Sequence, residues 1–409
     1  MAYKHSIYLL FKLLRLTGFQ ESYYKFQSEW KNKLMTVLFW TNNILGVFTL
    51  GTHIINTMTA STRYMPEFFQ RLLEDVAFFE VYLEANLIRT NLKDLMQLLH
   101  HMETLFISQE LEIVHKYHVK AKGIFFVAVA ICGVCLMASV LETYFPVSQE
   151  ELDLLAYIYD RKYPDNRLQT TFWIPGIDDS EPPYYQVIFV MEFYLIFMFF
   201  LMAILSVSLI PMLVTHIAGQ YEILCKQIQG LGRQEICIVS DKACRRVQDL
   251  QDRESMRNIY QAHSNLIYAQ SKLQNLYSPN MFIKVLLNNL LFALCLYQLT
   301  LSTTTVSKFR VYKLTVEFFT VAFQFYYLCH CSEMLDDCNS QLGRAAWNSY
   351  WYRCSRHVQK DLMMLLRRVQ VPNHLKFYEG AIVFSHVYFL GVVKVSYSFV
   401  NCLRMKSRG

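Results

Sequence analysis

Long apolar runs separated by polar connections dominate the chain and determine the fold that we predict for it. A helix needs about 20 largely apolar residues to cross roughly 30 Å of hydrocarbon. Six runs reach this length, at about 34–57, 122–144, 187–214, 280–303, 311–334 and 379–403. Their length and spacing are typical of a polytopic helical membrane protein.

A seventh candidate span, at about 66–88, has poor hydropathy because it is rich in charge. The charged residues are Glu67, Arg71, Glu74, Asp75, Glu80 and Glu84. This pattern alone also fits a soluble amphipathic helix. We interpret it as a span that faces a polar cavity or other helices, where charge inside a membrane is tolerated. The sequence therefore predicts an all-α membrane protein with seven transmembrane helices.

The polar connections are predicted to be structured as well. An amphipathic stretch from Ile7 to Leu16 places Leu9, Leu10, Leu13 and Leu14 against Lys12 and Arg15, and it has no cleavage site of a signal peptide. The expected divisions are an amphipathic N-terminal segment at 1–33, helices one to four at 34–214 with an outer loop at 145–186, cytoplasmic helices at 215–279, helices five and six at 280–334, anchor helices at 335–378, and the last helix with a short tail at 379–409.

Apolar positions recur at helical spacing within the two longest inner connections, at 216–231, 253–276 and 335–370. Pro372 and Asn373 then interrupt the chain before the last span. These helical faces have no bilayer to bury them. We therefore expect them to pack on each other, or on a partner subunit, as an intracellular bundle.

Lys and Arg residues are unevenly divided between the two sides of the predicted membrane. The side that holds the N-terminus carries 26 of them in its connections, and the other side carries 9. Because basic residues accumulate in cytoplasmic connections, we expect a cytoplasmic N-terminus and an extracellular C-terminus. This orientation is the inverse of that of a G-protein-coupled receptor. The outer loop at 145–186 is acidic, which favours either a plain solvated face or a field that concentrates cations at a pore mouth.

The composition supports the membrane interpretation and excludes several functions. Hydrophobic residues make up 54% of the chain and charged residues 18%, against about a quarter in soluble proteins. The basic residues form no stripe that would bind nucleic acid. The 11 cysteines are an odd number and lie mostly in apolar runs, so they fit buried thiols better than a disulfide framework.

No motif for a phosphate loop, an acyl-transfer nucleophile, a zinc protease or a dinucleotide site is present. Cys329, His330, Cys331 and Cys338 form a local cluster that we interpret as core side chains rather than metal ligands, because zinc sites usually join separate elements. We therefore expect neither an enzyme nor a cofactor. An aromatic-rich bundle of this kind suits a small apolar ligand.

Several motifs, taken in order, resemble those of the insect odorant receptor family. The sharpest lies near the C-terminus, where KFYEGA at 376–381 and FSHVYF at 384–389 precede VVKVSYSFVNCL at 392–403. Weaker matches are FKLLRLTGF at 11–19, FWIP at 172–175, PPYY at 182–185, THIAGQYEIL at 215–224 and QFYYLC at 324–329. Together they cover most of the chain. The outer-loop pattern departs at Ile174, where the family usually has an aromatic residue.

The resemblance implies an odorant-gated, non-selective cation channel in the plasma membrane of olfactory sensory neurons. Family members assemble as tetramers in which a divergent odorant-binding subunit joins a shared coreceptor. The modest inner loop after the fourth span favours the odorant-binding subunit, because the coreceptor has an extended loop there. Two alternatives stay open: a homomeric gustatory or coreceptor-like channel, and a G-protein-coupled receptor. Membrane lipid and permeant cations are the other implied partners.

The resemblance also implies positions for a ligand pocket and a pore. The family's pocket lies between spans two, three, four and six in the outer half of the membrane. The candidate ligand residues are Val76, Phe79, Tyr82, Met137, Val140, Leu141, Tyr144, Ile188, Met191, Glu192, Phe319, Ala322 and Phe323. The last helix lines the family's pore, and aligning Tyr397 with the tyrosine at the family's conserved position places the constriction at Val400 and Leu403. Each of these positions also fits ordinary helix packing.

Overall fold

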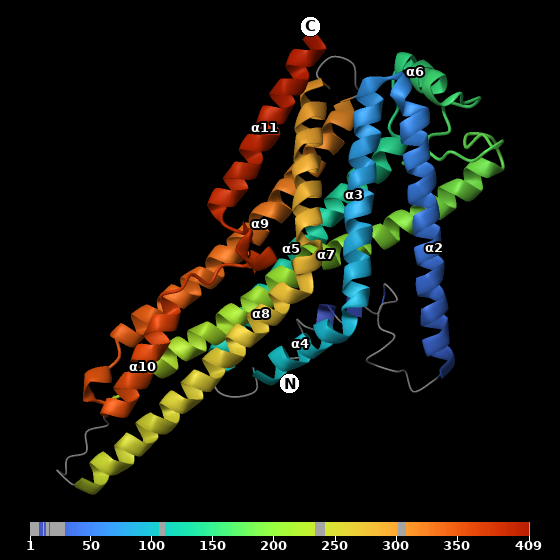
Figure 1. The fold of residues 1–409 in the computed structure, drawn as a ribbon. Helices are drawn as coiled ribbons and strands as arrows, with labels where there is room; N and C mark the ends of the chain where they lie inside the picture. Colours follow the sequence, from blue (N-terminus) through green and yellow to red (C-terminus); the bar gives the residue numbers. More distant parts are fainter. Residues whose placement is uncertain are drawn as a thin grey trace.

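A computed structural model shows that the protein is a bundle of long helices with one small β-hairpin (Figure 1). The structure describes residues 8–10, 12–13, 16, 29–105, 111–233, 242–301 and 308–408. The helices are α2 (Glu29–Thr59), α3 (Met65–Thr90), α4 (Leu92–Leu105), α5 (Leu111–Tyr144), α6 (Gln149–Tyr159), α7 (Tyr184–Gln229), α8 (Lys242–Leu301), α9 (Lys308–Trp347), α10 (Arg356–Val369) and α11 (His386–Arg408). Short 3-10 turns η1 (Ser61–Arg63), η2 (Trp351–Arg353) and η3 (Tyr378–Gly380) and strands β1 (Lys376–Phe377) and β2 (Ile382–Val383) complete it.

Every predicted span lies largely on one of seven long helices, α2, α3, α5, α7, α8, α9 and α11. Within the described residues, four helices are long and apolar enough to cross a membrane by composition alone: Lys33–Arg63, Leu111–Tyr144, Tyr184–Gln229 and Met281–Thr300. The other three carry charged or polar side chains that lower their mean hydropathy.

Helix α7 is the centre of the bundle, and α2 is its most peripheral long helix. Residues 204–219 of α7 are almost continuously buried, and α5 and α9 are the helices that pack most extensively on α7. A helix that is apolar on all sides is stable only in such surroundings. By contrast, α2 packs chiefly on α3 and η1 and leaves one long apolar face exposed.

The charged residues of α3 are buried and paired with other helices, as the sequence interpretation required. Arg71 lies between Glu67, at 2.9 Å, and Glu74, at 2.8 Å, on its own helix. From α9, Arg310 pairs with Glu67, and Lys313 lies 3.0 Å from Glu74. Such pairs make charge tolerable inside an apolar bundle, because removing one partner would leave the other uncompensated.

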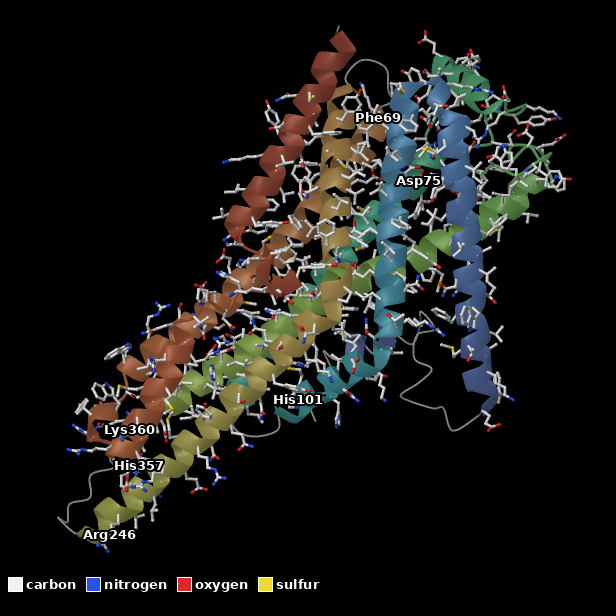
Figure 2. All side chains as sticks on the ribbon, viewed as in Figure 1. Phe69, Asp75, His101, Arg246, His357 and Lys360 are labelled. Atoms are coloured by element: carbon white, nitrogen blue, oxygen red, sulfur yellow. The ribbon has the colours of Figure 1, made fainter. Side chains whose placement is uncertain are left out.

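At the end of the bundle away from α6, the membrane helices continue without a break into the predicted inner connections (Figure 1). The stretch predicted at 216–231 is the end of α7, and the one at 253–276 belongs to α8, a helix of 60 residues with Pro279 inside it. Helix α10 packs on α8 and α9 there. Arg246, His357 and Lys360 gather at this end, far from Phe69 on α3 (Figure 2).

The acidic outer loop is folded rather than loose. Its helix α6 starts at a Ser148 cap, and a buried Arg161–Asp179 pair with a 2.6 Å contact ties its two halves together. The hydroxyl of Tyr159 donates to Glu67 over 2.9 Å, which joins the loop to α3. Burial raises the pKa of Tyr159 to about 12, so its phenol stays a neutral donor near pH 7.

The last helix begins at His386 rather than near residue 379. The preceding residues form the β1–β2 hairpin, in which Glu379 and Gly380 adopt positive φ values of 55° and 95°, outside the range of a right-handed α-helix. At the other end of the chain, Leu10 and Leu13 of the predicted amphipathic segment are buried in the main core. Leu9 is half-buried and Leu16 is exposed, whereas Leu14 and most of residues 1–28 lie outside the described residues.

Candidate ligand-binding site

A cavity of about 210 Å³ lies between α3, α5, α7, α8 and α9. We call it the inner cavity. Its walls are mostly apolar, with three free thiols, hydroxyls and amides as polar groups. The lining includes Leu73, Ala77, Phe78, Val81, Cys132, Cys135, Leu136, Ser139, Ile196, Phe199, Phe200, Ala203, Leu291, Cys295, Thr320, Val321 and Gln324. The free thiols belong to Cys132 and Cys135 on α5 and to Cys295 on α8. The sequence predicts a membrane span on both of these helices.

One part of the inner cavity is charged. Glu74, Lys313 and Glu317 line it. The ammonium of Lys313 lies 2.7 Å from Glu142, 3.0 Å from Glu74 and 3.9 Å from Glu317. The side chain of Lys313 is only 5% exposed, so these acids replace the water that it has lost. The cavity thus joins an apolar body to one strongly polar wall.

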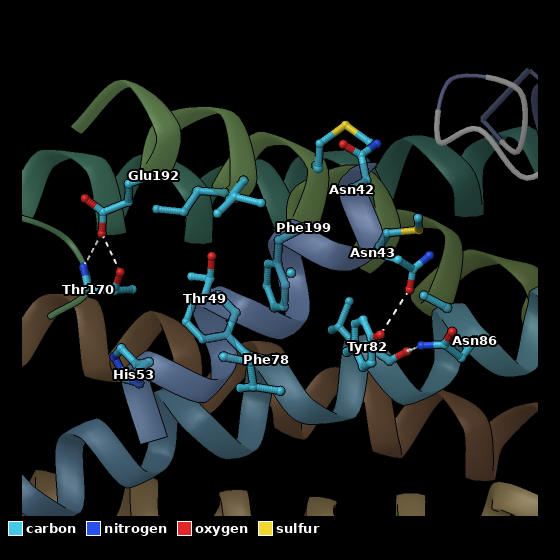
Figure 3. Close-up of a pocket in the computed structure, with 18 of the residues that line it drawn as sticks. Asn42, Asn43, Thr49, His53, Phe78, Tyr82, Asn86, Thr170, Glu192 and Phe199 are labelled. Carbon is cyan, nitrogen blue, oxygen red and sulfur yellow. Dashed lines mark hydrogen bonds between the residues drawn. The ribbon is translucent and has the colours of Figure 1, made fainter. Parts of the chain in front are cut away.

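A second cavity, of about 140 Å³, lies between α2, α3 and α7, and we call it the outer cavity (Figure 3). Tyr82 donates to Asn43 over 3.0 Å at one end, and Glu192 accepts hydrogen bonds from Thr170 at the other. The two cavities share Phe78, Val81, Thr170, Ile196 and Phe199 as common wall. The rings of Phe78 and Phe199 meet edge to face at 4.8 Å.

Of the predicted ligand residues, Tyr82 and Glu192 line the outer cavity and the other eleven line neither cavity. Val76 packs toward α8 in a cluster with Leu291 and Leu294, while Ile188 and Met191 pack under the outer loop with Leu168 and Phe172. The remaining positions are Phe79, Met137, Tyr144 and Phe319, which are exposed, and Val140, Leu141, Ala322 and Phe323, which are half-buried. Their contact with ligand stays a prediction.

The predicted ligand residues and the residues that line the cavities lie on different faces of the same helices, because the helices are rotated about their axes relative to the prediction. On α5 the cavity side is Cys132, Cys135, Leu136 and Ser139, whereas the predicted set begins at Met137. A shift of five residues turns the face by about 140°. The polar and small residues within the apolar run could have indicated the cavity side of the helix. A wall inside the protein needs such residues more than a lipid-facing surface does.

Val400 is 3% exposed, on the same face of α11 as Val392 and Ser396, and this face packs toward α8. Ser398 is exposed on the opposite side of the helix. Leu403 lies within α11, and its side chain is outside the described residues. Because a pore between subunits depends on the assembly, the assignment of Val400 and Leu403 to the pore stays a prediction.

Comparison with known proteins identifies the family. A family model described as "7tm Odorant receptor" matches residues 85–397, which is more than half of the chain. The chain belongs to the odorant receptor family. The receptor is therefore a multi-pass membrane protein, and because its family is one of receptors, the expectation that it is not an enzyme is confirmed.

Individual relatives are distant but consistent with this assignment. The receptor is 25% identical to Odorant receptor 83a of Drosophila melanogaster over 35% of its chain and 32% of that protein. It is 24% identical to Odorant receptor 67c of the same species, over 41% of its chain and 40% of the relative, and 24% identical to Odorant receptor Or2 of Anopheles gambiae, over 56% and 59%. These matches span well under two thirds of the relatives' length.

The fold matches over nearly the whole chain. The olfactory receptor OR5 of Machilis hrabei superimposes with a TM-score of 0.74, covering 97% of each chain at 15% identity. Its complex with eugenol superimposes with a TM-score of 0.77, covering 99% of the receptor and 100% of the relative, again at 15% identity. This likeness confirms the predicted all-α seven-helix fold.

Proposed function

We propose that the receptor is the odorant-binding subunit of a heteromeric, ligand-gated, non-selective cation channel in the plasma membrane of olfactory sensory neurons. It binds a small volatile ligand in the inner cavity. The observation that carries this proposal is the inner cavity itself, an apolar space with a few polar groups in the middle of five helices. Sites for small ligands have this composition and tend to lie between the helices of a bundle.

The family assignment supports an odorant as the ligand. The related OR5 of Machilis hrabei has been solved with eugenol, which is an aromatic molecule with polar oxygens. A ligand of this class would bury its ring against Phe199 and Phe200 and gain about 25 cal/mol for each Å² of apolar surface. Its oxygens would face hydroxyl and amide groups such as those of Ser139 and Gln324.

Helix α9 offers a physical connection from the inner cavity to α11. Val321 and Gln324 line the cavity, and the next residue, Phe325, is fully buried against α11 and the segment before it. Its ring lies 5.9 Å from that of Phe384 and 6.1 Å from that of Phe389. A ligand that shifts α9 would therefore move the packed aromatic cluster at the start of α11. We propose that α11 lines the pore.

Expression of the receptor with and without a coreceptor subunit tests the function. We expect cation currents in response to at least one volatile from a panel of eugenol, 1-octanol, 2-heptanone and ethyl hexanoate, and only when the coreceptor is present. Odorant currents from the receptor alone would instead support the homomeric gustatory or coreceptor-like alternative. Silence under both conditions across a broad panel would contradict the proposal.

The location of the ligand is tested by filling the inner cavity. Val321→Phe adds a ring to the cavity wall, and we expect it to raise the half-maximal odorant concentration about tenfold or more, as a loss of ~1.4 kcal/mol does. Val190→Phe makes the same change on an exposed face of α7 and should have no such effect. If Phe79→Ala, Tyr144→Ala and Phe323→Ala shift the response while Val321→Phe does not, the ligand site is the one predicted from the sequence.

A further inference from the structure

We propose that the outer cavity is a vestibule through which ligands enter the inner cavity from the bilayer, between α2 and α7. This entry route rests on the function proposed above. The lining of the outer cavity also indicates which class of ligand would use the route, and a pair of aromatic side chains separates the two cavities. The class is a neutral molecule of about the size of one ring, with one oxygen that accepts a hydrogen bond. The rings of Phe78 and Phe199 form the partition between vestibule and inner cavity.

The position of α2 makes this side of the bundle the accessible one. Helix α2 packs chiefly on α3 and η1 rather than on α7. On α7, Phe193 and Phe197 are exposed, although Ile196 between them lines the outer cavity. Between these two helices lies the outer cavity, with Leu50 from α2 and Ile196 from α7 among its lining residues. A volatile that is dissolved in lipid therefore reaches the outer cavity through side chains alone, without crossing any backbone.

A hydrogen bond spans the mouth between α2 and α7. The hydroxyl of Tyr194, on α7, donates to Oδ1 of Asn42, on α2, over 2.6 Å. The amide nitrogen Nδ2 of the same Asn42 is buried and has no hydrogen-bond partner among the described residues. A buried donor without an acceptor costs about 1–3 kcal/mol, so the vestibule favours a ligand with an alcohol, ether, ketone or ester oxygen.

The size of the vestibule fits one such molecule. An engineered apolar cavity of about 150 Å³ holds benzene, and the outer cavity has about 140 Å³. Its lining is mainly apolar, with Phe39, Leu50 and Met202 among the contributors. A single-ring volatile can thus bind transiently in the vestibule, with its oxygen accepting a hydrogen bond from Nδ2 of Asn42.

The partition is formed by side chains. Phe78 and Phe199 both line the two cavities, and their rings meet edge to face at 4.8 Å with 75° between their planes. Ile196 and Val81 complete the shared wall. Rotation of one aromatic side chain would therefore open a path from the vestibule to the inner cavity.

Blocking the vestibule should slow the response without changing its sensitivity. An obstructed path raises the barrier for entry and exit equally, so rise and decay rates fall by the same factor while the half-maximal concentration stays constant. Leu50→Trp fills the vestibule, and we expect both rates to fall about tenfold, which is ~1.4 kcal/mol of added barrier. Ile44→Trp places the same ring on the opposite, exposed face of α2 as the matched control.

The measurement is the current through the receptor and coreceptor during rapid application and removal of the panel member that evokes the largest response. Phe78→Ala, which removes the ring of the partition that is not assigned to ligand contact, should accelerate both phases and serves if Leu50→Trp is not expressed. Unchanged kinetics in Leu50→Trp or in Phe78→Ala would overturn the route. A changed half-maximal concentration in Leu50→Trp with unchanged kinetics would make the outer cavity the binding site itself and also overturn it. Silence of the unmodified receptor would instead contradict the proposed function.

Discussion

Individual charged residues decide how α3 can lie inside the bundle. Lys313 is the clearest case, because its ammonium is surrounded by carboxylates from three helices, Glu74 on α3, Glu142 on α5 and Glu317 on its own helix. The sequence shows that the charges of 66–88 need partners, since unpaired charge is costly in an apolar bundle. It does not show which partners, because Lys313 lies more than 200 residues further along the chain.

We predict that Lys313→Met severely reduces the amount of folded receptor at the cell surface. Removing one member of a buried charge group leaves the others uncompensated, at about 3–5 kcal/mol. Combining it with Glu74→Gln and Glu142→Gln should restore part of the surface protein, measured by surface biotinylation. Arg63→Ala breaks an exposed pair with Asp160 and should change little. Normal surface levels of Lys313→Met would mean that the network does not stabilise the fold.

At the scale of single helices, hydropathy predicted where the spans lie but not how they are turned. The apolar runs at 122–144 and 187–214 coincide with α5 and α7, because burial in lipid and burial in protein select the same residues. For the same reason an apolar helix carries almost no sequence signal for its inward side. Eleven of the thirteen predicted ligand residues lie away from the described cavities, although all of them belong to helices that line one.

For α11, too, the apolar pattern does not show which face of the helix lines the pore. The accessibility of substituted cysteines tests this. Family alignment places Val400 and Leu403 at the constriction, and we predict that a thiol reagent applied from outside during odorant exposure reduces the current of Val400→Cys. Ser398→Cys, two residues away on the opposite side of the helix, should be unaffected. The reverse result would transfer the pore-lining face to Ser398, in line with the burial of Val400 in the single chain.

Val400→Ser gives a functional test of the same constriction. An apolar ring excludes hydrated ions, so a small polar side chain should increase the basal current or alter the permeability ratios of cations. The rank order of odorants should not change, because the cavities lie in other helices. A changed rank order with an unchanged basal current would contradict a role of Val400 in the pore.

The whole molecule has two distinct ends. The acidic outer loop with α6 lies at the same end as the C-terminus of α11, and the basic residues Arg246 and Lys360 lie at the other (Figures 1 and 2). We predict that epitope tags in intact cells are accessible at the C-terminus and inaccessible at the N-terminus, since Lys and Arg favour the cytoplasmic side 26 to 9. An accessible N-terminal tag would contradict the inverted topology.

The inner end also carries apolar side chains that the single chain leaves uncovered. Trp347 on α9 and Met363 and Met364 on α10 are each more than 60% exposed. We predict that Met363→Glu with Met364→Glu abolishes co-purification with the coreceptor, because charge at an apolar contact must be desolvated. Tyr157→Glu changes an equally exposed side chain on the outer helix α6 and should leave the complex intact. Loss of the complex only in Tyr157→Glu would place the subunit contact at the outer end.

Helix α8 constrains how such a protein can change over evolutionary time. It is one helix of 60 residues, about 90 Å along its axis, that reaches from the inner end of the molecule into the predicted fifth membrane span. Inserting or deleting a single residue near its middle would turn one half against the other by about 100°, so every contact of one half would meet the wrong neighbour. Substitutions can accumulate along this helix, whereas changes of its length cannot. Relatives should therefore keep the number of residues between the two halves of α8 even where almost no amino acid is shared, and vary in length in the connections on either side.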